Sequence, residues 1–364
     1  MRGRLLALLT ALLVGLTGCS SLLDREYVSI TAHNTTPTAE GDPSVLRAES
    51  YQELVNALIY FVSQGMETGS VRLYMEGGDP QADLEAACLE VVQEDPLGAY
   101  AVEYIKYSIS SIVTYDEADI QITYRRTKEQ IDSISSVTGT TAIRNELESA
   151  LSAFAPERVL RISYFDGDED YIRSLCREAF LDNPASALDM PDIQVAIYPE
   201  AGRQRIVEIL LTYHLEVQEL KRRQDLLLAL QAETVQALSA TQGDPEIIAA
   251  ARKIQSIASY SPDGGSTAYH AFLAGQADSL GLSLAMALLC QGLDVSWQVV
   301  PGTLNGEEHN WLVVLTQSGW MHLDMSTSVG WGAPFRTDQQ MEQNGYQWNR
   351  DNVPACGPAA QEAG

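Results

Sequence analysis

The 364-residue sequence is poor in basic side chains: 23 Lys and Arg stand against 49 Asp and Glu, which gives a formal net charge of -26 at pH 7. Nucleic acids and anionic lipid headgroups bind surfaces that carry positive charge. The charge balance therefore predicts no nucleic-acid partner. The hydrophobic fraction of 45% is typical of a globular protein, so the acidity does not indicate general disorder.

Cysteine is also scarce. Apart from one Cys near the N-terminus, the thiols are Cys88, Cys176, Cys290 and Cys356, and no two of them have Cys-x-x-Cys spacing. We expect isolated buried thiols, with a Cys88–Cys176 disulfide as the alternative. The sequence also lacks a Gly-rich phosphate loop and metal-spaced His and Cys clusters, so it predicts no cofactor and no metal site.

No apolar run near the N-terminus is long enough to span a bilayer, because the run at 5–16 is too short. Arginines precede it, and Leu16-Thr17-Gly18-Cys19 follows at once. This arrangement resembles the signal peptide and lipobox of a bacterial lipoprotein. The resemblance implies removal of residues 1–18, lipidation of Cys19, and a mature protein anchored by its lipid on the extracytoplasmic face of the cell membrane. An ordinary signal peptide that contains a Cys is the alternative.

Two stretches of the N-terminal half match each other. DLEAACLEVVQEDP (Asp83–Pro96) and YIRSLCREAFLDNP (Tyr171–Pro184) start 171 minus 83, or 88, residues apart, with Cys and Pro in register. In each copy a helix pattern and a strand pattern come before the stretch, and two strand patterns follow it. Internal duplication explains this best, with units of order α, β, α, β, β at 49–135 and 136–220. Chance agreement of amphipathic segments is the alternative.

The rest of the chain divides by composition. A spacer rich in Ser, Thr, Pro and Gly occupies 19–48, and strong helix formers predict a helical connector at 221–245. A last domain spans 246–332, and weak periodicity predicts an irregular tail at 333–364. The acidic run Asp166–Asp170 lacks most of a calcium-binding loop, which favours a solvated turn over a calcium site.

The last domain is organised around one predicted helix. Ser279–Gln291 is apolar nearly all round, which indicates a helix buried in the centre of its domain. Strand patterns follow at 295–300, His309–Leu315 and Trp320–Asp324. A helix N-terminus stabilises a thiolate, a His on a neighbouring strand could hold the proton, and an Asp could orient that His. The order of these elements indicates a catalytic core, although Ser279 stands where a Cys is expected.

A series of residues in this domain carries a family likeness: Thr267-Ala268-Tyr269, Gly275, Ser279-Leu280-Gly281-Leu282-Ser283, Gly292-Leu293, Gly302, His309-Asn310-Trp311 and Trp320 through Asp324. They resemble the core of the transglutaminase-like family, with its Cys-x-Gly-x-Ala, His-x-Trp and Trp-x-x-x-Asp pattern. The resemblance implies a cysteine-protease-like (papain-like) fold and a Cys, His, Asp triad. His309 and Asp324 match the family's His and Asp, whereas Ser279 replaces its Cys. Met325 stands where a Pro often follows the Asp.

The predicted fold class is α+β: a C-terminal transglutaminase-like domain preceded by two duplicated α/β units and a helical connector. A hydroxyl ionises far less readily than a thiol, and a site built for a thiolate loses most of its rate on Cys-to-Ser exchange. We therefore expect an inactive domain that binds or scaffolds a peptide, protein or cell-wall ligand.

Two other functions stay open. One is an active hydrolase or acyltransferase in which Ser279 is the nucleophile, His309 the base and Asp324 the orienting group. The other is a purely structural envelope lipoprotein in which these are ordinary strand residues. His270 and His322 have no comparable sequence context and are expected to be structural.

Overall fold

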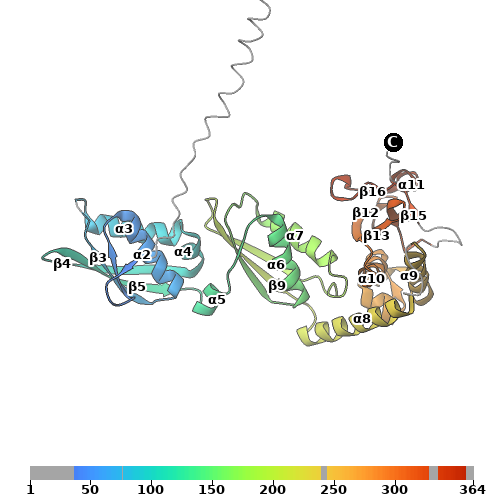
Figure 1. Cartoon of the computed structure of the whole chain (residues 1–364), viewed down its shortest axis with the longest axis horizontal. Helices are drawn as coiled ribbons and strands as arrows, with labels where there is room; N and C mark the ends of the chain where they lie inside the picture. The colour runs from blue at the N-terminus through green and yellow to red at the C-terminus, as the bar shows by residue number, and fades with distance from the viewer. Residues whose placement is uncertain (1–36, 76, 239–243, 328–334, 358–364) are drawn as a thin grey trace, which may run out of the picture. The chain divides into compact units, whose positions relative to one another are not determined.

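The computed structural model describes residues 37–75, 77–238, 244–327 and 335–357 (Figure 1). The chain is α+β and divides into two compact units: unit 1 contains residues 1–88 and 105–122, and unit 2 contains 89–104 and 123–364. The predicted signal peptide and the predicted lipidation site Cys19 lie outside the described residues. No helix within the described ranges is long and apolar enough to cross a membrane.

Unit 1 is built on a five-stranded sheet of order β1-β2-β3-β5-β4. The strands are β1 (Thr38–Ala39), β2 (Val45–Ala48), β3 (Thr68–Leu73), β4 (Val102–Ile112) and β5 (Tyr115–Tyr124), and the helices are α2 (Tyr51–Gln64) and α3 (Pro80–Gln93). Helix α2 starts after Ser50, whose hydroxyl accepts a hydrogen bond from the Glu53 N–H. Its buried face carries Leu54, Leu58 and Phe61 at helical spacing, which fixes the face that packs on the sheet.

The first part of unit 2 contains a four-stranded sheet of order β6-β7-β9-β8. Its elements are α4 (Pro96–Ala101), α5 (Lys128–Asp132), β6 (Ser135–Val137), α6 (Thr140–Ser152), β7 (Glu157–Ile162), α7 (Glu169–Leu181), β8 (Asp192–Tyr198) and β9 (Arg205–Thr212). Strands β6 and β7 pair in parallel, as β2 and β3 do in unit 1. The next strand in each sheet, β9 beside β7 and β5 beside β3, is antiparallel.

Each of these sheets has strands before the first helix that the sequence did not predict: β1 and β2 in the sheet of unit 1, and β6 in the four-stranded sheet. The missed strands, Val45–Ala48 and Ser135–Val137, are too short to show a clear period. Internal duplication as the cause of the shared order stays a prediction.

The C-terminal part of unit 2 packs around α10 (Ser279–Gly292). Helices α8 (Val217–Leu238) and α9 (Asp244–Ile257) contact it on one side, and strands β12 (Trp297–Leu304) and β13 (Glu307–Thr316) contact it on the other (Figure 1). Residues Leu282 to Cys290 of α10 are all buried. The nearly continuous apolar sequence of this helix follows from its place between two layers.

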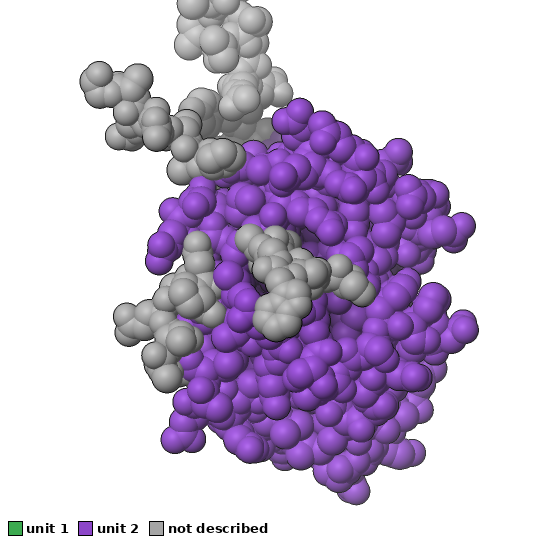
Figure 2. Space-filling view, turned by 90° about the vertical axis from the view of Figure 1, so that its right-hand side faces the viewer, with its two compact units in different colours: residues 1–88, 105–122 green, residues 89–104, 123–364 purple. Residues whose placement is uncertain are grey.

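The sheet on which α10 packs has five strands in the order β15-β14-β13-β12-β16. Besides β12 and β13 it contains β14 (Gly319–Leu323), β15 (Phe335–Arg336) and β16 (Tyr346–Trp348), and α11 (Asp338–Gln343) lies between the last two in the chain. The prediction of an irregular tail from residue 333 was wrong, because its described part supplies both edge strands of this sheet. Figure 2 shows unit 2 in space-filling form from the side that carries these elements.

Three short elements connect α9 to α10. Strand β10 (Ser259–Gly265) pairs in parallel with β11 (Gln276–Ala277), and the π-helix η2 (His270–Ala274) lies between them in the chain. A 3-10 turn, η3 (Arg350–Asn352), follows β16. Strand β11 leads directly into α10, so its pairing with β10 brings β10 next to the N-terminus of that helix.

Candidate active site

Ser279 is the first residue of α10, and Asp278 caps the helix. The Asp278 carboxylate accepts a hydrogen bond of 2.8 Å from the Gly281 N–H and another from the Ser266 hydroxyl. Gly281 allows a close approach here, because a β-carbon at this position would lie 2.4 Å from the carbonyl oxygen of Gly265. The cap and the glycine together hold the N-terminal turn of α10 against β10.

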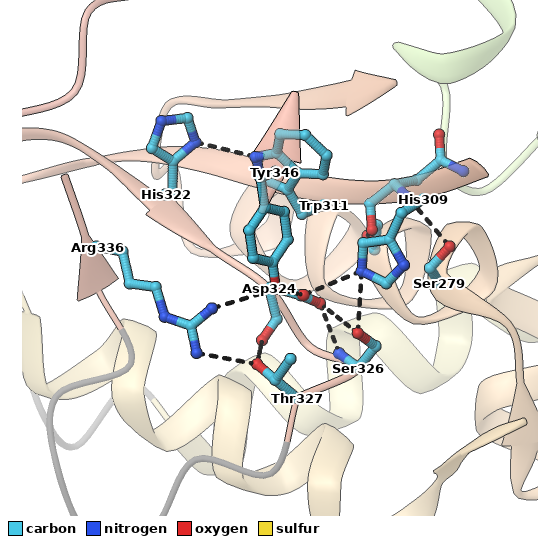
Figure 3. Close-up of polar contacts among 11 residues, drawn as sticks. Ser279, His309, Trp311, His322, Asp324, Ser326, Thr327, Arg336 and Tyr346 are labelled. Carbon is cyan, nitrogen blue, oxygen red and sulfur yellow. Dashed lines mark hydrogen bonds and ion pairs between the residues drawn. The ribbon is translucent and has the colours of Figure 1, made fainter. Parts of the chain in front are cut away.

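His309 lies on β13 opposite Gly302 of β12 and is 4% exposed. Its Nε2 atom is 3.0 Å from Oδ2 of Asp324 and 3.1 Å from Oγ of Ser326 (Figure 3). A carboxylate can only accept, so Nε2 carries the proton and donates it. The other ring nitrogen, Nδ1, lies on the side of the ring that faces Ser279 in Figure 3.

Asp324 ends up with every acceptor position in use and is 3% exposed. Oδ1 accepts from the Ser326 N–H at 2.8 Å and from the Ser326 hydroxyl at 2.7 Å, while Oδ2 accepts from His309 and, at 2.5 Å, from the Tyr346 hydroxyl. Burial alone raises the pKa of Asp324, but the hydrogen bonds from His309, Tyr346 and Ser326 outweigh it and hold that pKa below its ordinary value. The carboxylate is therefore ionised at neutral pH.

Ser279 is close to this pair but is not hydrogen-bonded to the His309 ring. Its Oγ accepts a hydrogen bond of 3.1 Å from the backbone N–H of Asn310, which places it beside the peptide bond that joins His309 to Asn310. Among the described residues no hydrogen bond joins Ser279 to His309. The structure thus brings together two of the predicted triad residues as a bonded pair and holds the third by a backbone amide.

His322 forms a second buried chain of hydrogen bonds on the same sheet. The indole N–H of Trp311 donates to His322 Nδ1 at 2.9 Å, so His322 must carry its proton on Nε2, which donates to Asp338 Oδ1 at 2.8 Å. Burial lowers the pKa of His322 and keeps the ring neutral. The Trp311 ring stacks on His309 at 6.3 Å between centroids, so this chain supports one wall of the site.

Three possible metal ligands lie close together around His322, but the proton of the His322 ring is on the nitrogen that a metal would need. Possible ligand atoms of His322, Asp338 and Cys356 lie within 4.8 Å of one another. A metal on Nε2 would need the proton on Nδ1, yet the Trp311 N–H already occupies that position as a donor. Burial also raises the pKa of the Cys356 thiol to about 12. These residues therefore do not fit a metal ion.

Other predictions from the sequence are settled by simple contacts. The four described cysteines are all free and buried, so the expectation of isolated thiols is confirmed and a Cys88–Cys176 disulfide is wrong. In the acidic run, Asp168 caps α7 through the Tyr171 N–H, and Asp170, in the first turn of that helix, pairs with Arg173. His270 bonds Thr267 at 2.8 Å within the connecting segment.

Ser326, which contacts both His309 and Asp324, was not anticipated from the sequence, and neither were two residues of the C-terminal segment. Tyr346 belongs to β16, and Arg336 to β15; both lie in the segment predicted to be irregular. Arg336 donates to the Tyr346 hydroxyl at 3.2 Å and to Thr327 at 3.3 Å (Figure 3). The only signal was Tyr346-Gln347-Trp348, whose aromatic residues alternate with a polar one and could have been interpreted as an edge strand.

No protein-family model and no curated protein matches the sequence. The chain aligns with a solved structure of a TGase at 11% identity and a TM-score of 0.27, over 62% of this chain and 67% of that one. It aligns with a candidate cysteine protease from Cytophaga hutchinsonii at 11% identity and a TM-score of 0.25, over 38% and 63% of the two chains. A candidate protease from Parabacteroides distasonis gives 7% identity and a TM-score of 0.19, over 72% and 44%. The chain thus spans less than two thirds of the last two proteins, and TM-scores this low carry no argument about function.

Proposed function

We propose that the chain is a surface-anchored bacterial lipoprotein whose C-terminal domain is transglutaminase-like, inactive, and used to bind or scaffold a peptide-containing ligand from a protein or the cell wall. The observation that carries the proposal is the state of the three triad positions. His309 and Asp324 form a buried, hydrogen-bonded pair, whereas Ser279 has no hydrogen bond to His309 among the described residues and its hydroxyl oxygen accepts from the Asn310 N–H. A base is thus kept without an activated nucleophile.

The choice of serine matters because of its proton. A thiol next to an imidazole and a helix N-terminus loses its proton before it attacks, whereas a hydroxyl must lose it during the attack. Such an attack needs a hydrogen bond from the hydroxyl to the base. In the described part of the chain, the Ser279 hydroxyl has no hydrogen bond to His309 and only accepts one from the Asn310 N–H. The Asp278 carboxylate already accepts a hydrogen bond from an N–H group at the N-terminus of α10. The helix N-terminus therefore stabilises a second anion, such as an ionised residue 279, less strongly.

Binding is supported by an accessible aromatic side chain at the site. Tyr260 of β10 is 43% exposed, and its ring lies edge-on to His309 at 6.3 Å between centroids. Exposed aromatic rings beside buried polar groups are common in ligand sites. Co-sedimentation with purified peptidoglycan tests this part. We expect Tyr260→Ala to lose binding and Tyr164→Ala, which removes a ring 61% exposed elsewhere, to retain it. Equal binding by both variants would contradict the placement of the ligand.

The degenerate triad is tested by restoring the thiol. In the Ser279→Cys variant, iodoacetamide should alkylate position 279 at least roughly tenfold faster than the other cysteines, and adding His309→Ala should remove that advantage. The chain offers an internal reference, because burial raises the pKa of Cys88, Cys176 and Cys290 to about 12. Peptide mass spectrometry resolves the label at each position. Labelling no faster than at the buried thiols would favour the purely structural alternative.

The second candidate function is a hydrolase or acyltransferase that uses Ser279. The observation in its favour is that His309 Nε2 lies within hydrogen-bond distance of the ionised Asp324, while Nδ1 lies on the side of the ring that faces Ser279. A fluorophosphonate probe distinguishes the two functions on the native chain. Labelling that disappears in Ser279→Ala would establish the active enzyme, and the absence of labelling would support the inactive domain.

Lipid anchoring is tested independently. We expect a bacterial host to incorporate a fatty-acid label into the native chain and not into Cys19→Ala. Incorporation into both forms would contradict Cys19 as the lipidation site. The same labelled cells, treated with protease before lysis, report whether the chain lies on the extracytoplasmic face.

A further inference from the structure

Tyr346 brings the C-terminal segment into the candidate active site. It belongs to β16, pairs with Leu304 of β12, and is 3% exposed. Its hydroxyl lies 2.5 Å from Oδ2 of Asp324, the same oxygen that accepts the proton of His309 Nε2 (Figure 3). One carboxylate oxygen therefore receives donors from β13 and from β16.

The direction of the Tyr346 hydrogen bond is fixed by its neighbours. The Arg336 guanidinium has only donors, and Nη1 lies 3.2 Å from the Tyr346 oxygen, so that oxygen accepts from Arg336. Its single proton then points to Asp324. Burial, followed by the nearby charge of Asp324, raises the pKa of Tyr346, so the phenol keeps this proton at neutral pH.

The phenol ring is held as firmly as its hydroxyl. It packs edge-on against His309, with 5.9 Å between centroids, and against Trp311 at 5.2 Å. These two ring contacts and the hydroxyl contact together hold the phenol beside the carboxylate.

We propose that Tyr346 is a positioning residue for the His309–Asp324 pair, which orients the Asp324 carboxylate and takes up part of its negative charge, so that the C-terminal segment sets the basicity of His309. This role rests on the proposed function of the pair. A carboxylate whose charge is shared with a phenol O–H stabilises an imidazolium less strongly than one bonded to the imidazole alone. Loss of the phenol O–H by substitution should thus make His309 more basic without breaking its bond to Asp324.

The titration of His309 measures this effect directly. In a chain labelled with ¹³C only at its five histidines, the His309 signal is assigned as the one lost in His309→Gln. We expect Tyr346→Phe to move the His309 midpoint to higher pH by about half a unit to one unit, while the His214 midpoint stays at its native value. A His309 midpoint that stays at its native pH in Tyr346→Phe would overturn the proposal.

A matched control separates this role from general loss of a buried hydroxyl. In the described part of the chain the buried Tyr213 hydroxyl has no hydrogen-bond partner, and it belongs to the segment between β9 and α8. Tyr213→Phe should leave the His309 midpoint unchanged. If Tyr346→Phe does not fold, Arg336→Gln weakens the same phenol as a donor and should shift His309 in the same direction by a smaller amount. No shift in that variant would also count against the proposal.

The titration of His309 and the alkylation of Ser279→Cys test different claims, so either one can fail without the other. The titration uses the native Ser279 and needs neither nucleophile nor ligand. Slow alkylation of Ser279→Cys would contradict the degenerate triad and leave the titration result intact. Conversely, fast alkylation with an unchanged His309 midpoint in Tyr346→Phe would keep the triad and remove the role of Tyr346.

Discussion

The two faces of the C-terminal sheet are buried by different chemistry. The face toward α10 is covered by aliphatic side chains such as Val299, Leu312 and Val314. The opposite face carries Trp311 and Tyr346 in a smaller cluster with the C-terminal segment, and it also holds the buried polar groups of the site. The first face is stabilised by burial that needs no particular partner, whereas each polar group on the second needs a specific one. The first face therefore determines the fold, and the second determines the chemistry.

The largest effect is expected on the aliphatic face. Leu284 in the middle of α10 is fully buried, so Leu284→Ala should lower the free energy of unfolding by about 2–5 kcal/mol. Urea unfolding followed by Trp fluorescence isolates this domain, because all five Trp residues lie between 297 and 348. Leu228→Ala on α8, at 43% exposure, is the control and should change little. Equal losses in the two variants would remove the contrast between core and surface on which the comparison rests.

On the second face, loss of one buried hydrogen-bond donor should lower the free energy of unfolding more than a reduction in side-chain volume does. Trp311→Phe keeps an aromatic ring but leaves His322 Nδ1 buried without a donor, which should cost about 1–3 kcal/mol of unfolding free energy beyond the smaller ring. Trp320→Phe on the adjacent strand, where the side chain is half-buried, is the control. The urea midpoints of the two variants provide the measurement, and a smaller loss for Trp311→Phe than for Trp320→Phe would argue that the hydrogen bond is unimportant.

Ser326→Ala should give a smaller loss, of about 1 kcal/mol, because Asp324 Oδ1 keeps the backbone N–H of residue 326 as a donor. Among the described residues Oδ2 has two donors, His309 and Tyr346, so Tyr346→Phe removes one of the two and should destabilise the domain more. Urea unfolding of both variants orders them. A larger loss for Ser326→Ala than for Tyr346→Phe would mean that the Ser326 N–H is not enough to hold the Asp324 carboxylate once the Ser326 hydroxyl is removed.

The smallest expected effect is one of pH. The unfolded chain protonates His322 near pH 6.5, while burial lowers the pKa of this residue in the folded chain, so the unfolded state binds more protons as the pH falls below about 6.5. The contribution of His322 to stability is thus present above that pH and declines below it. His322→Gln, whose amide can accept from Trp311 and donate to Asp338, should flatten this decline. Identical pH profiles for the native chain and the variant would show that His322 does not titrate on unfolding.

The aliphatic face was predictable from the sequence. A run such as Ser279–Gln291, apolar on all sides, has few places in a domain other than between two layers. The pairing of His309 with Asp324 depended on the hairpin between β13 and β14. The structure pairs Thr316 with Gly319, so only Gln317 and Ser318 form the turn, and a register shifted by one residue would have turned Asp324 to the other face.

The second face was not predictable, because its elements have no internal signal. Strands β15 and β16 contain two and three residues, and such short segments form only when an existing edge offers backbone partners. Their roles come from contacts far apart in the chain, such as the 22 residues that separate Tyr346 from Asp324. Local pattern therefore pointed to His309 and Asp324 but missed Tyr346, which contacts both of them.

The four hydrogen bonds to Asp324 also bear on how such a site changes by mutation over generations. Replacing this carboxylate would leave donors of His309, Ser326 and Tyr346 unpaired inside the domain, so the first consequence would be poor folding, whatever the state of the chemistry. Replacing the residue at 279 disturbs one backbone contact. Asp324 is thus tied to the folding of the domain, whereas residue 279 can change at little structural cost.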